Sequence, residues 1–213
     1  MDAFIFDFDG LLVDTEWPAF ITVHEVFRAH GAEMTLEQWQ ARIGRGDNRP
    51  WVELLEEQVG AVDHVAINRL RQVKKNQMTE QQPLLPGVSA LLDTAERLGL
   101  AKGVASSSAI DWVRPHLERR GIAGRFGAVL TRDQVARAKP WPDLFVAACE
   151  ALAVEPTRAV AFEDSVHGVT AAKDAGLFCV AVPNRVTAGG DFTRADMVLA
   201  TLEDLDLAEL GLA

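Results

Sequence analysis

The stretch Ala3-Phe4-Ile5-Phe6-Asp7-Phe8-Asp9-Gly10 decides the fold of this chain. Four apolar residues lead into two aspartates and a glycine, a pattern typical of a buried strand that ends in a turn. Residues two apart in a strand point the same way, so Asp7 and Asp9 should project together from its carboxyl end. Ligands of open α/β sheets bind outside these ends, and two close carboxylates require a cation or a shared proton. The stretch therefore suggests an acidic site, and turn-forming acids that only cap a strand are the alternative.

Composition and charge limit the class of protein. The chain has 213 residues, 48% of them hydrophobic, which suits one good-sized core or a core with a smaller domain. The net charge of −10 disfavours nucleic acid as a partner. The sequence contains neither an apolar run of membrane-spanning length nor a basic leader, so we expect a cytoplasmic protein without a membrane partner. Because no long apolar surface stripe is left over, we also expect a monomer.

The chain divides into a helical segment and an alternating segment. Residues 15–82 show only helical patterns, whereas strands and helices alternate from Val88 onward. Alternation of this kind predicts an α/β fold with a Rossmann-like parallel sheet between two helical layers. We therefore predict a discontinuous core of residues 1–14 and 83–213, interrupted by an all-helical cap domain of residues 15–82.

Polar side chains follow four of the predicted strands at the point where each strand ends. They are Asp7 and Asp9 after the first strand, Ser106 to Ser108 after residues 101–105, Lys139 after residues 128–130, and Glu163 with Asp164 after residues 159–162. The carboxyl ends of parallel strands meet at one edge of a sheet, so these side chains should lie together. Each could be a helix cap or a solvated charge, but four such coincidences in register favour one common site.

These residue types suit phosphoryl transfer at a magnesium ion. Carboxylates are the ligands that Mg²⁺ prefers, and a serine hydroxyl, helix amides and a lysine suit a phosphate. One aspartate can act as a nucleophile through an aspartyl-phosphate. A second aspartate two residues further on can protonate the leaving alcohol and then activate water. The sequence therefore predicts Mg²⁺ as the cofactor of a phosphoryl-transfer enzyme.

Four motifs resemble those of the haloacid dehalogenase-like hydrolase superfamily in their order and spacing. They are Asp7-Phe8-Asp9-Gly10-Leu11-Leu12-Val13-Asp14-Thr15, then Ser106, then Lys139-Pro140 with Pro142-Asp143, and finally Phe162-Glu163-Asp164-Ser165-Val166-His167-Gly168-Val169. Within the superfamily, the chain looks like the phosphoglycolate phosphatase and β-phosphoglucomutase branch. That branch places a helical cap between the first and second motifs, which agrees with the helical segment of residues 15–82.

The resemblance implies the catalytic and metal-binding roles of four acids. Asp7 is the nucleophile and a Mg²⁺ ligand. Asp9 is the general acid/base, and its backbone carbonyl also binds the metal. Asp164 is a metal ligand, and Glu163 binds the metal directly or through water.

The resemblance also implies a phosphate site and a reaction. Ser106 and Lys139 bind the transferring phosphoryl group with the backbone amide of Ser107, and Lys139 also holds Asp7 in place. The predicted reaction is hydrolysis of a small phosphate monoester, such as a sugar phosphate. The substrate itself is not predicted, because the cap sets that choice.

The presence of Asp9 helps to distinguish among the other chemistries of the branch. Dehalogenases lack the second aspartate, and phosphonatases replace it and use a cap lysine, so Asp9 argues against both despite Lys74 and Lys75 in the cap. A β-phosphoglucomutase-like sugar phosphomutase is the main alternative. Such proteins commonly carry a histidine where this chain has Ala19, which favours hydrolysis.

Two cap arginines are candidates for substrate selection. A mutase needs a cap arginine for a second phosphate, and Arg45 or Arg49 in the turn-rich segment 44–50 could supply it, although exposed loop charge is an equal interpretation. A non-catalytic binding protein on the same scaffold is a remote alternative, because every catalytic position of the motifs is retained.

Overall fold

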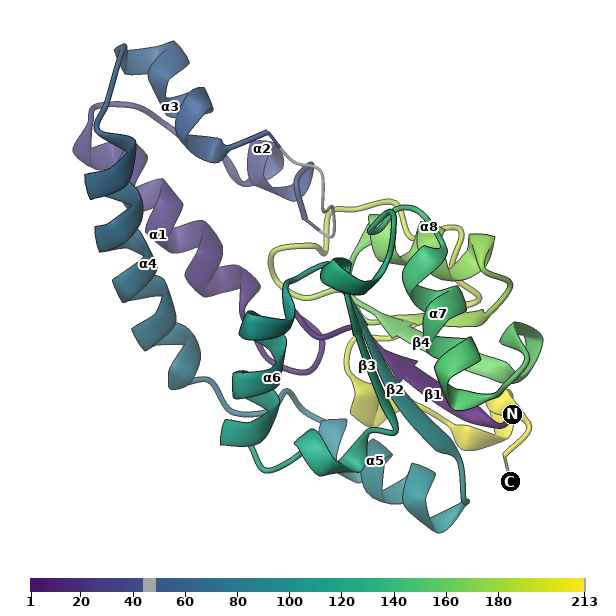
Figure 1. Cartoon of the computed structure of the whole chain (residues 1–213). Helices are drawn as coiled ribbons and strands as arrows, with labels where there is room; N and C mark the ends of the chain where they lie inside the picture. The colour runs from purple at the N-terminus through teal and green to yellow at the C-terminus, as the bar shows by residue number, and fades with distance from the viewer. Residues whose placement is uncertain (44–48, 213) are drawn as a thin grey trace.

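Strand β1 (Ala3–Phe6) lies in the interior of a parallel sheet (Figure 1). The structure is a computed structural model that describes residues 1–43 and 49–212. Within these residues the sheet has six strands in the order β3-β2-β1-β4-β5-β6. The other strands are β2 (Ala101–Ser106), β3 (Ala128–Thr131), β4 (Ala159–Glu163), β5 (Phe178–Ala181) and β6 (Met197–Val198). The predicted α/β fold is confirmed, with a parallel sheet and an inserted set of helices.

Helices cover both faces of this sheet. The core helices are α5 (Val88–Arg97), α6 (Ile110–Arg119), α7 (Asp143–Leu152) and α8 (Val166–Asp174). Phe4 and Phe6 pack in one hydrophobic cluster with α5 and α6, whereas Ala3 and Ile5 pack in a second cluster with α7 and α8. The alternation of side chains along a strand explains this division. Short 3-10 helices lie at η1 (Ala123–Arg125), η2 (Arg132–Gln134), η3 (Pro156–Arg158), η4 (Leu202–Asp204) and η5 (Leu207–Leu210).

Four helices between β1 and α5 stand apart from the sheet as an insertion (Figure 1). They are α1 (Glu16–Ala29), α2 (Leu36–Gln40), α3 (Trp51–Val59) and α4 (His64–Glu80). A third hydrophobic cluster, which includes Phe20, Phe27 and Leu55, holds them together. Their range agrees with the predicted cap of residues 15–82, and we refer to α1–α4 as the cap. The exact domain boundaries stay a prediction.

The two connections between cap and core, which we refer to as the hinge, run side by side. Val13 and Leu84 form an antiparallel bridge, and the amide of Leu85 donates a hydrogen bond to the carbonyl of Leu12 at 3.0 Å. A core residue, Val186, also packs within the apolar cluster of the cap, and its carbonyl accepts a hydrogen bond from Gln40 at 2.6 Å. The cap is thus seated on the core at its hinge and at the loop that follows β5.

Local hydrogen bonds define where two of the cap helices begin and end. A capping box of Thr35 and Gln38 begins α2, and the helix ends at Gln40. The amide of Ala41 still bonds four residues back to Glu37, but the amides of Arg42 and Ile43 bond only three residues back, which tightens the chain out of the α-helix. At the start of α1, Asp14 accepts the capping bond from the amide of Trp17 at 3.0 Å, and the Thr15 hydroxyl is used elsewhere.

None of the helices among the described residues has both the length and the apolar character needed to cross a membrane. The two cysteines, Cys149 and Cys179, are buried free thiols, as their apolar sequence context predicts.

Candidate active site

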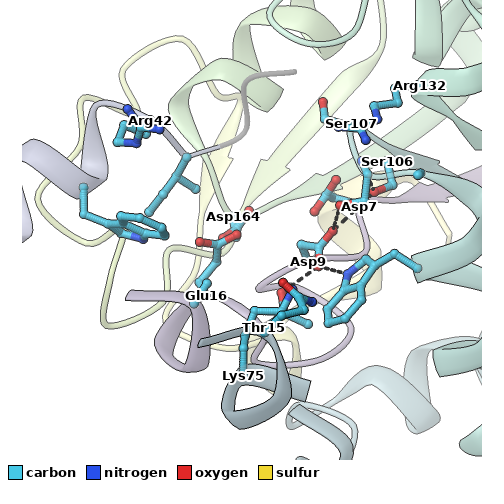
Figure 2. Close-up of a pocket in the computed structure, with 17 residues that line it drawn as sticks. Asp7, Asp9, Thr15, Glu16, Arg42, Lys75, Ser106, Ser107, Arg132 and Asp164 are labelled. Carbon is cyan, nitrogen blue, oxygen red and sulfur yellow. Dashed lines mark hydrogen bonds between the residues drawn. The ribbon is translucent and has the colours of Figure 1, made fainter. Parts of the chain in front are cut away.

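The predicted site residues meet where the carboxyl ends of the strands face the cap. Asp7 follows β1, Ser106 ends β2, Glu163 ends β4 and Lys139 lies in the segment between β3 and α7. A cavity of about 420 Å³ opens between this edge of the sheet and the cap. Figure 2 shows Asp7, Asp9 and Asp164 turned toward it from the core, with Lys75 and Arg42 on the cap side. The topology therefore brings the four motifs to one place.

Lys139 is an ammonium group buried between two carboxylates. Its Nζ donates hydrogen bonds to Asp7 and to Oε1 of Glu163, the latter at 2.5 Å. Burial by itself would favour the neutral amine, but the two carboxylates outweigh it and hold the pKa of Lys139 above its ordinary value. The other oxygen of Glu163 accepts the Ser165 hydroxyl at 3.1 Å. Only a glycine fits at position 168, where a Cβ would lie 1.9 Å from the Glu163 carboxyl carbon.

Three buried carboxylates form a group that could hold a metal ion. Asp7, Glu163 and Asp164 each offer an oxygen within 4.8 Å of the others, and all three are at most 6% exposed. Burial raises the pKa of Asp7 to about 8, with Glu163 and Asp9 adding to the shift and Lys139 opposing it. Burial, followed by Asp7 and Glu163, likewise holds the pKa of Asp164 well above its ordinary value. Since Lys139 offsets one of three negative charges, the oxygen ligands and the remaining charge fit a divalent cation such as Mg²⁺.

Asp164 is held in place by a glycine turn and an amide. Gly10 adopts a positive φ of 81°, and a Cβ at this position would lie 2.3 Å from Oδ2 of Asp164. Asn184, in the loop after β5, donates to the same oxygen at 2.7 Å and to the carbonyl of Gly10 at 3.1 Å. Asn184 therefore ties the carboxylate of the fourth motif to the backbone of the first motif.

Asp9 is surrounded by hydrogen-bond donors. Its Oδ1 accepts the Thr15 hydroxyl at 2.7 Å and the indole N–H of Trp112 at 2.8 Å. Its Oδ2 accepts the Ser108 hydroxyl at 2.5 Å and lies 3.5 Å from the Ser106 hydroxyl. These donors come from the first motif, from the end of β2 and from α6. They fix the orientation of the predicted general acid/base.

Two of the three predicted phosphate-binding residues line the same cavity, whereas Lys139 is buried beside Asp7 and does not line it. Ser106 and Ser107 lie on its core side, and Ser106 Oγ accepts the backbone amide of Ser108 at 3.1 Å. Arg132, which follows β3, lines the cavity near Ser107 in Figure 2. A hydroxyl, backbone amides and cationic side chains next to Asp7 suit an anionic phosphoryl group.

The cap contributes polar side chains to the opposite wall. Lys75 on α4 is largely buried, which lowers its pKa to about 8, while Asp9 and Glu16 act in the opposite direction. Burial, with the charges of Asp9 and Asp7, raises the pKa of Glu16 to about 8. Arg42 lines the wall as well, and so does Ala19, whose methyl group stands where a mutase commonly has a histidine.

The two cap arginines chosen from the sequence are placed differently from Arg42. Arg45 lies outside the described residues. Arg49 is half-exposed and pairs with Glu53 at 2.5 Å and with Glu57 at 2.7 Å, and it does not line the cavity. The structure thus brings the predicted site residues of the core together, whereas Arg49 forms ion pairs with side chains at the surface of α3.

Sequence reasoning missed several residues of this site, among them Trp112, Asn184 and Arg42, and it did not assign Lys75 to the site. Trp112 and Asn184 lie outside the four motifs, and their partners Asp9 and Asp164 are 103 and 20 positions away. The sequence offers Lys75 only beside Lys74 as a cap lysine of a phosphonatase, and Asp9 argues against that chemistry. Arg71 and Lys75 are partly buried and Thr79 is buried, at helical spacing, but these polar residues form no apolar stripe that would separate Lys75 from Lys74 in the sequence.

Together, the fold and the site define an α/β enzyme with a helical cap over an acidic, metal-competent centre. Comparison with known proteins agrees. Residues 4–182 match the family described as haloacid dehalogenase-like hydrolase. YhcW of Bacillus subtilis (strain 168) is 41% identical over 98% of this chain and 95% of its own length. The phosphorylated carbohydrates phosphatase of Thermotoga maritima is 32% identical over 83% of this chain and 82% of its own.

A solved structure covers the whole fold. The crystal structure of CbbY from Rhodobacter sphaeroides in complex with phosphate has a TM-score of 0.79, with 31% identity over 100% of both chains. A second structure of CbbY, also with a TM-score of 0.79, holds xylulose-(1,5)bisphosphate, with 29% identity over 100% of this chain and 99% of that chain. The chain therefore belongs to the haloacid dehalogenase-like hydrolase family, and it is an enzyme of the phosphatase type within that family.

Proposed function

We propose that this chain is a Mg²⁺-dependent phosphatase that hydrolyses a small sugar-phosphate-like monoester through an aspartyl-phosphate on Asp7. The observation that carries the proposal is the arrangement of Asp7 and Asp9 at the carboxyl end of β1. Asp7 contacts Lys139 beside the acidic group, and Asp9 faces the same cavity two residues away. A nucleophile and an acid/base are thus placed around one site for a phosphoryl group.

The donor set defines where the metal would bind. Asp7 and Asp164 would hold Mg²⁺ together with the backbone carbonyl of Asp9, and Glu163 would do so directly or through water. Because Glu163 already accepts Lys139 and Ser165, its contact through water is the better fit. When bound, Mg²⁺ supplies positive charge to the phosphoryl oxygens in the transition state.

The first step transfers the phosphoryl group to the protein. Ser106, the amide of Ser107 and Lys139 bind its oxygens. A carboxylate oxygen of Asp7 attacks phosphorus, and the bond from phosphorus to the ester oxygen breaks. The carboxyl group of Asp9 gives its proton to that oxygen, so the alcohol leaves neutral and Asp9 becomes a carboxylate.

The second step returns the enzyme to its starting state. The carboxylate of Asp9 takes a proton from a water molecule as the water oxygen attacks the phosphorus. The bond from phosphorus to the Asp7 oxygen breaks, which releases phosphate and restores the Asp7 carboxylate. Lys139 stays paired with Asp7 and Glu163 throughout and stabilises the negative charge that develops next to it.

The substrate class rests on the cap wall and on the relatives. Gln72, Arg42 and Lys75 give this wall donors suited to hydroxyl and anionic groups of a polar substrate. Relatives include a phosphatase of phosphorylated carbohydrates and CbbY, of which one structure holds a sugar bisphosphate. A phosphorylated sugar or polyol agrees with both observations.

The test is phosphate release from a panel of esters that includes β-glucose 1-phosphate, glucose 6-phosphate, fructose 1-phosphate and p-nitrophenyl phosphate. Each ester is measured with Mg²⁺ and with EDTA, for the wild type, for Asp7→Asn and for Asp9→Asn. We expect Mg²⁺-dependent release that both substitutions abolish. Acid quenching followed by mass spectrometry of the Asp7 peptide should detect the phosphorylated aspartate.

Two outcomes would overturn the proposal. Formation of glucose 6-phosphate from β-glucose 1-phosphate with little free phosphate would identify a sugar phosphomutase despite Ala19. The absence of any product from folded, Mg²⁺-binding protein would favour a binding protein on this scaffold.

A further inference from the structure

One oxygen of the Asp9 carboxylate accepts a hydrogen bond from a residue outside the four motifs. The indole N–H of Trp112 donates to Oδ1 at 2.8 Å, on the same oxygen as the Thr15 hydroxyl. The other oxygen, Oδ2, faces the hydroxyls of Ser106 and Ser108 at the end of β2. The two oxygens of Asp9 therefore have different partners, and only Oδ2 faces Ser106 and Ser108.

The chemistry of indole makes this difference important. An indole N–H can donate a hydrogen bond but cannot accept one. The oxygen that Trp112 contacts must therefore remain an acceptor, and the acidic proton of Asp9 is directed to Oδ2. A serine hydroxyl can turn from donor to acceptor, so Ser108 accommodates Oδ2 with or without the proton.

The indole ring also contacts the cap. The ammonium of Lys75 on α4 lies 3.5 Å from the centroid of the Trp112 ring, which is a close cation–π contact. Trp112 thus stands between a cap side chain on its face and the Asp9 carboxylate at its edge. A shift of α4 relative to the core would change the contact that holds this ring.

Helix α6 joins this contact to the hinge of the cap. Trp112 and His116 are spaced by four residues on one side of α6, with their ring centroids 4.2 Å apart, and Arg120 follows four residues later, directly after the helix ends. Arg120 donates to the carbonyls of Thr79 and Gln82 at 2.9 Å and 2.8 Å, where α4 ends and the chain returns to the core.

His116 is the middle contact of this row. Burial and the charge of Arg120 lower its pKa. Nη1 of Arg120 lies 3.1 Å from Nδ1 of the His116 ring, and because a guanidinium can only donate, Nδ1 is the acceptor of this hydrogen bond. The same three side chains thus contact the acid at one end and the hinge at the other.

We infer that Trp112 is a positioning residue that orients Asp9 for proton transfer, and that Lys75 on its ring links the seating of the cap to that orientation. The inference rests on the acid/base role of Asp9 in the proposed function. Trp112 keeps Oδ1 as an acceptor, so that Oδ2 presents the proton to the leaving oxygen. The docking of the cap on the core and the orientation of the Asp9 carboxyl group then occur together.

Dependence on the leaving group tests the role of Trp112. p-Nitrophenolate leaves with little help from an acid, whereas a sugar alkoxide needs the proton. Trp112→Phe removes the N–H and keeps an aromatic face. We expect kcat/KM for the best sugar phosphate of the panel to fall about ten- to a hundredfold, the loss typical of one hydrogen bond to a charged group, with less than about a twofold change for p-nitrophenyl phosphate. Trp51→Phe, an indole loss in the cap away from the cavity, is the matched control and should leave the ratio of the two esters unchanged.

A pair of lysine variants tests the link to the cap. Lys75→Met keeps the aliphatic stem but removes the cation from the Trp112 ring, and it should lower the sugar-to-aryl ratio in the same direction. Lys74→Met removes the neighbouring lysine, which pairs with Glu25 at 2.6 Å on the surface, and should leave the ratio unchanged. Because Lys75 also lines the substrate wall, the double variant Trp112→Phe with Lys75→Met decides the link. No further fall in the sugar-to-aryl ratio beyond that of Trp112→Phe supports the link, whereas losses that multiply in the double variant would mean that Lys75 contacts only the substrate and would overturn it.

The outcomes separate this inference from the function on which it rests. If Asp9→Asn hydrolyses sugar phosphates as fast as the wild type, the acid/base assignment itself is wrong. If Asp9→Asn is inactive and Trp112→Phe is either unaffected or slowed equally on both esters, the positioning role of Trp112 is wrong. Unfolding temperatures of all variants show whether a uniform loss comes from instability, and the double variant then decides the link to the cap.

Discussion

The carboxyl edge of the sheet and the cap face the same cavity, but they are held together by different forces. At the edge, Lys139, Glu163 and Asp164 are at most 1% exposed, and their partners come from distant parts of the chain. The cap is held by an apolar cluster, and its charged pairs, such as Lys74 with Glu25, lie at the surface. The edge therefore depends on buried polar contacts, whereas the cap depends on packing.

This difference bears on how the two regions can change. A buried charge without its partner is costly, so each polar residue of the edge constrains the next one. Packing tolerates exchange among apolar residues of similar volume, and exposed ion pairs contribute little. Substitutions at the carboxyl edge of the sheet should therefore impair the reaction itself, whereas substitutions in the cap should mainly change which substrate is accepted. The predictions below test that contrast.

The largest effect is expected when the ammonium at the edge is removed. Lys139→Met leaves Asp7 and Glu163 without their shared counter-charge, so activity should fall by about a hundredfold to a thousandfold or more. Breaking a buried pair typically costs about 3–5 kcal/mol of unfolding free energy. Steady-state kinetics and urea denaturation measure both quantities. Lys74→Met is the matched control, and comparable losses in the two variants would contradict the contrast.

Metal removal should have the next largest effect, and it should depend on pH. The pKa of Asp7 is raised to about 8 in the folded protein, above the value of about 4 in an unfolded chain. Ionisation of Asp7 therefore destabilises the metal-free fold progressively as pH rises from about 4 to about 8. Because Mg²⁺ binds ionised carboxylates, the rise in Tm on adding Mg²⁺ should be larger at pH 8 than at pH 5.5.

Differential scanning fluorimetry at the two pH values, with Mg²⁺ or with EDTA, measures this rise. For a chain of this size, each kcal/mol corresponds to about 2–4 °C in Tm. Asp164→Asn should reduce the rise at both pH values. An equal rise at pH 5.5 and pH 8 in the wild type would show that the acidic cluster is not the binding site.

A smaller effect is expected at the residue that braces the cluster. Asn184→Ala removes the donors to Asp164 and to the Gly10 carbonyl, so the concentration of Mg²⁺ needed for half-maximal activity should rise about ten- to a hundredfold. Activity at saturating Mg²⁺ should recover most of the wild-type value. Titration of activity with Mg²⁺ checks this, and a loss that Mg²⁺ does not rescue would assign Asn184 to folding alone.

The smallest effects are expected in the cap. Arg42→Ala changes the cavity wall and should raise KM about tenfold, as for one lost charge-assisted contact, with kcat little changed. Arg49→Ala removes surface pairs with Glu53 and Glu57 and should change KM less than about twofold. The same substrate panel measures both variants. A larger effect in Arg49→Ala would restore Arg49 as the residue that selects the substrate.

Much of this arrangement was predictable from local patterns. The apolar run and glycine of 3–10 place Asp7 and Asp9 at a strand end, and the helical patterns of residues 15–82 predict the inserted helices. Alternating segments after Val88 predict the parallel sheet and hence the shared edge of Ser106, Glu163 and their neighbours. These features depend on backbone geometry and on side-chain periodicity within a few residues, so a short stretch of sequence is enough to predict them.

The placement of Trp112, Asn184 and Lys75 was decided by tertiary packing. Periodicity indicates which face of a helix or strand is buried, but not which distant side chain meets that face. Asp9 meets Trp112 because β1 and β2 pair in one register and α6 packs over them, and Lys75 reaches the same ring because α4 returns to the core beside α6. Local sequence patterns thus place the acids, whereas the donors that orient them depend on how separate elements pack together.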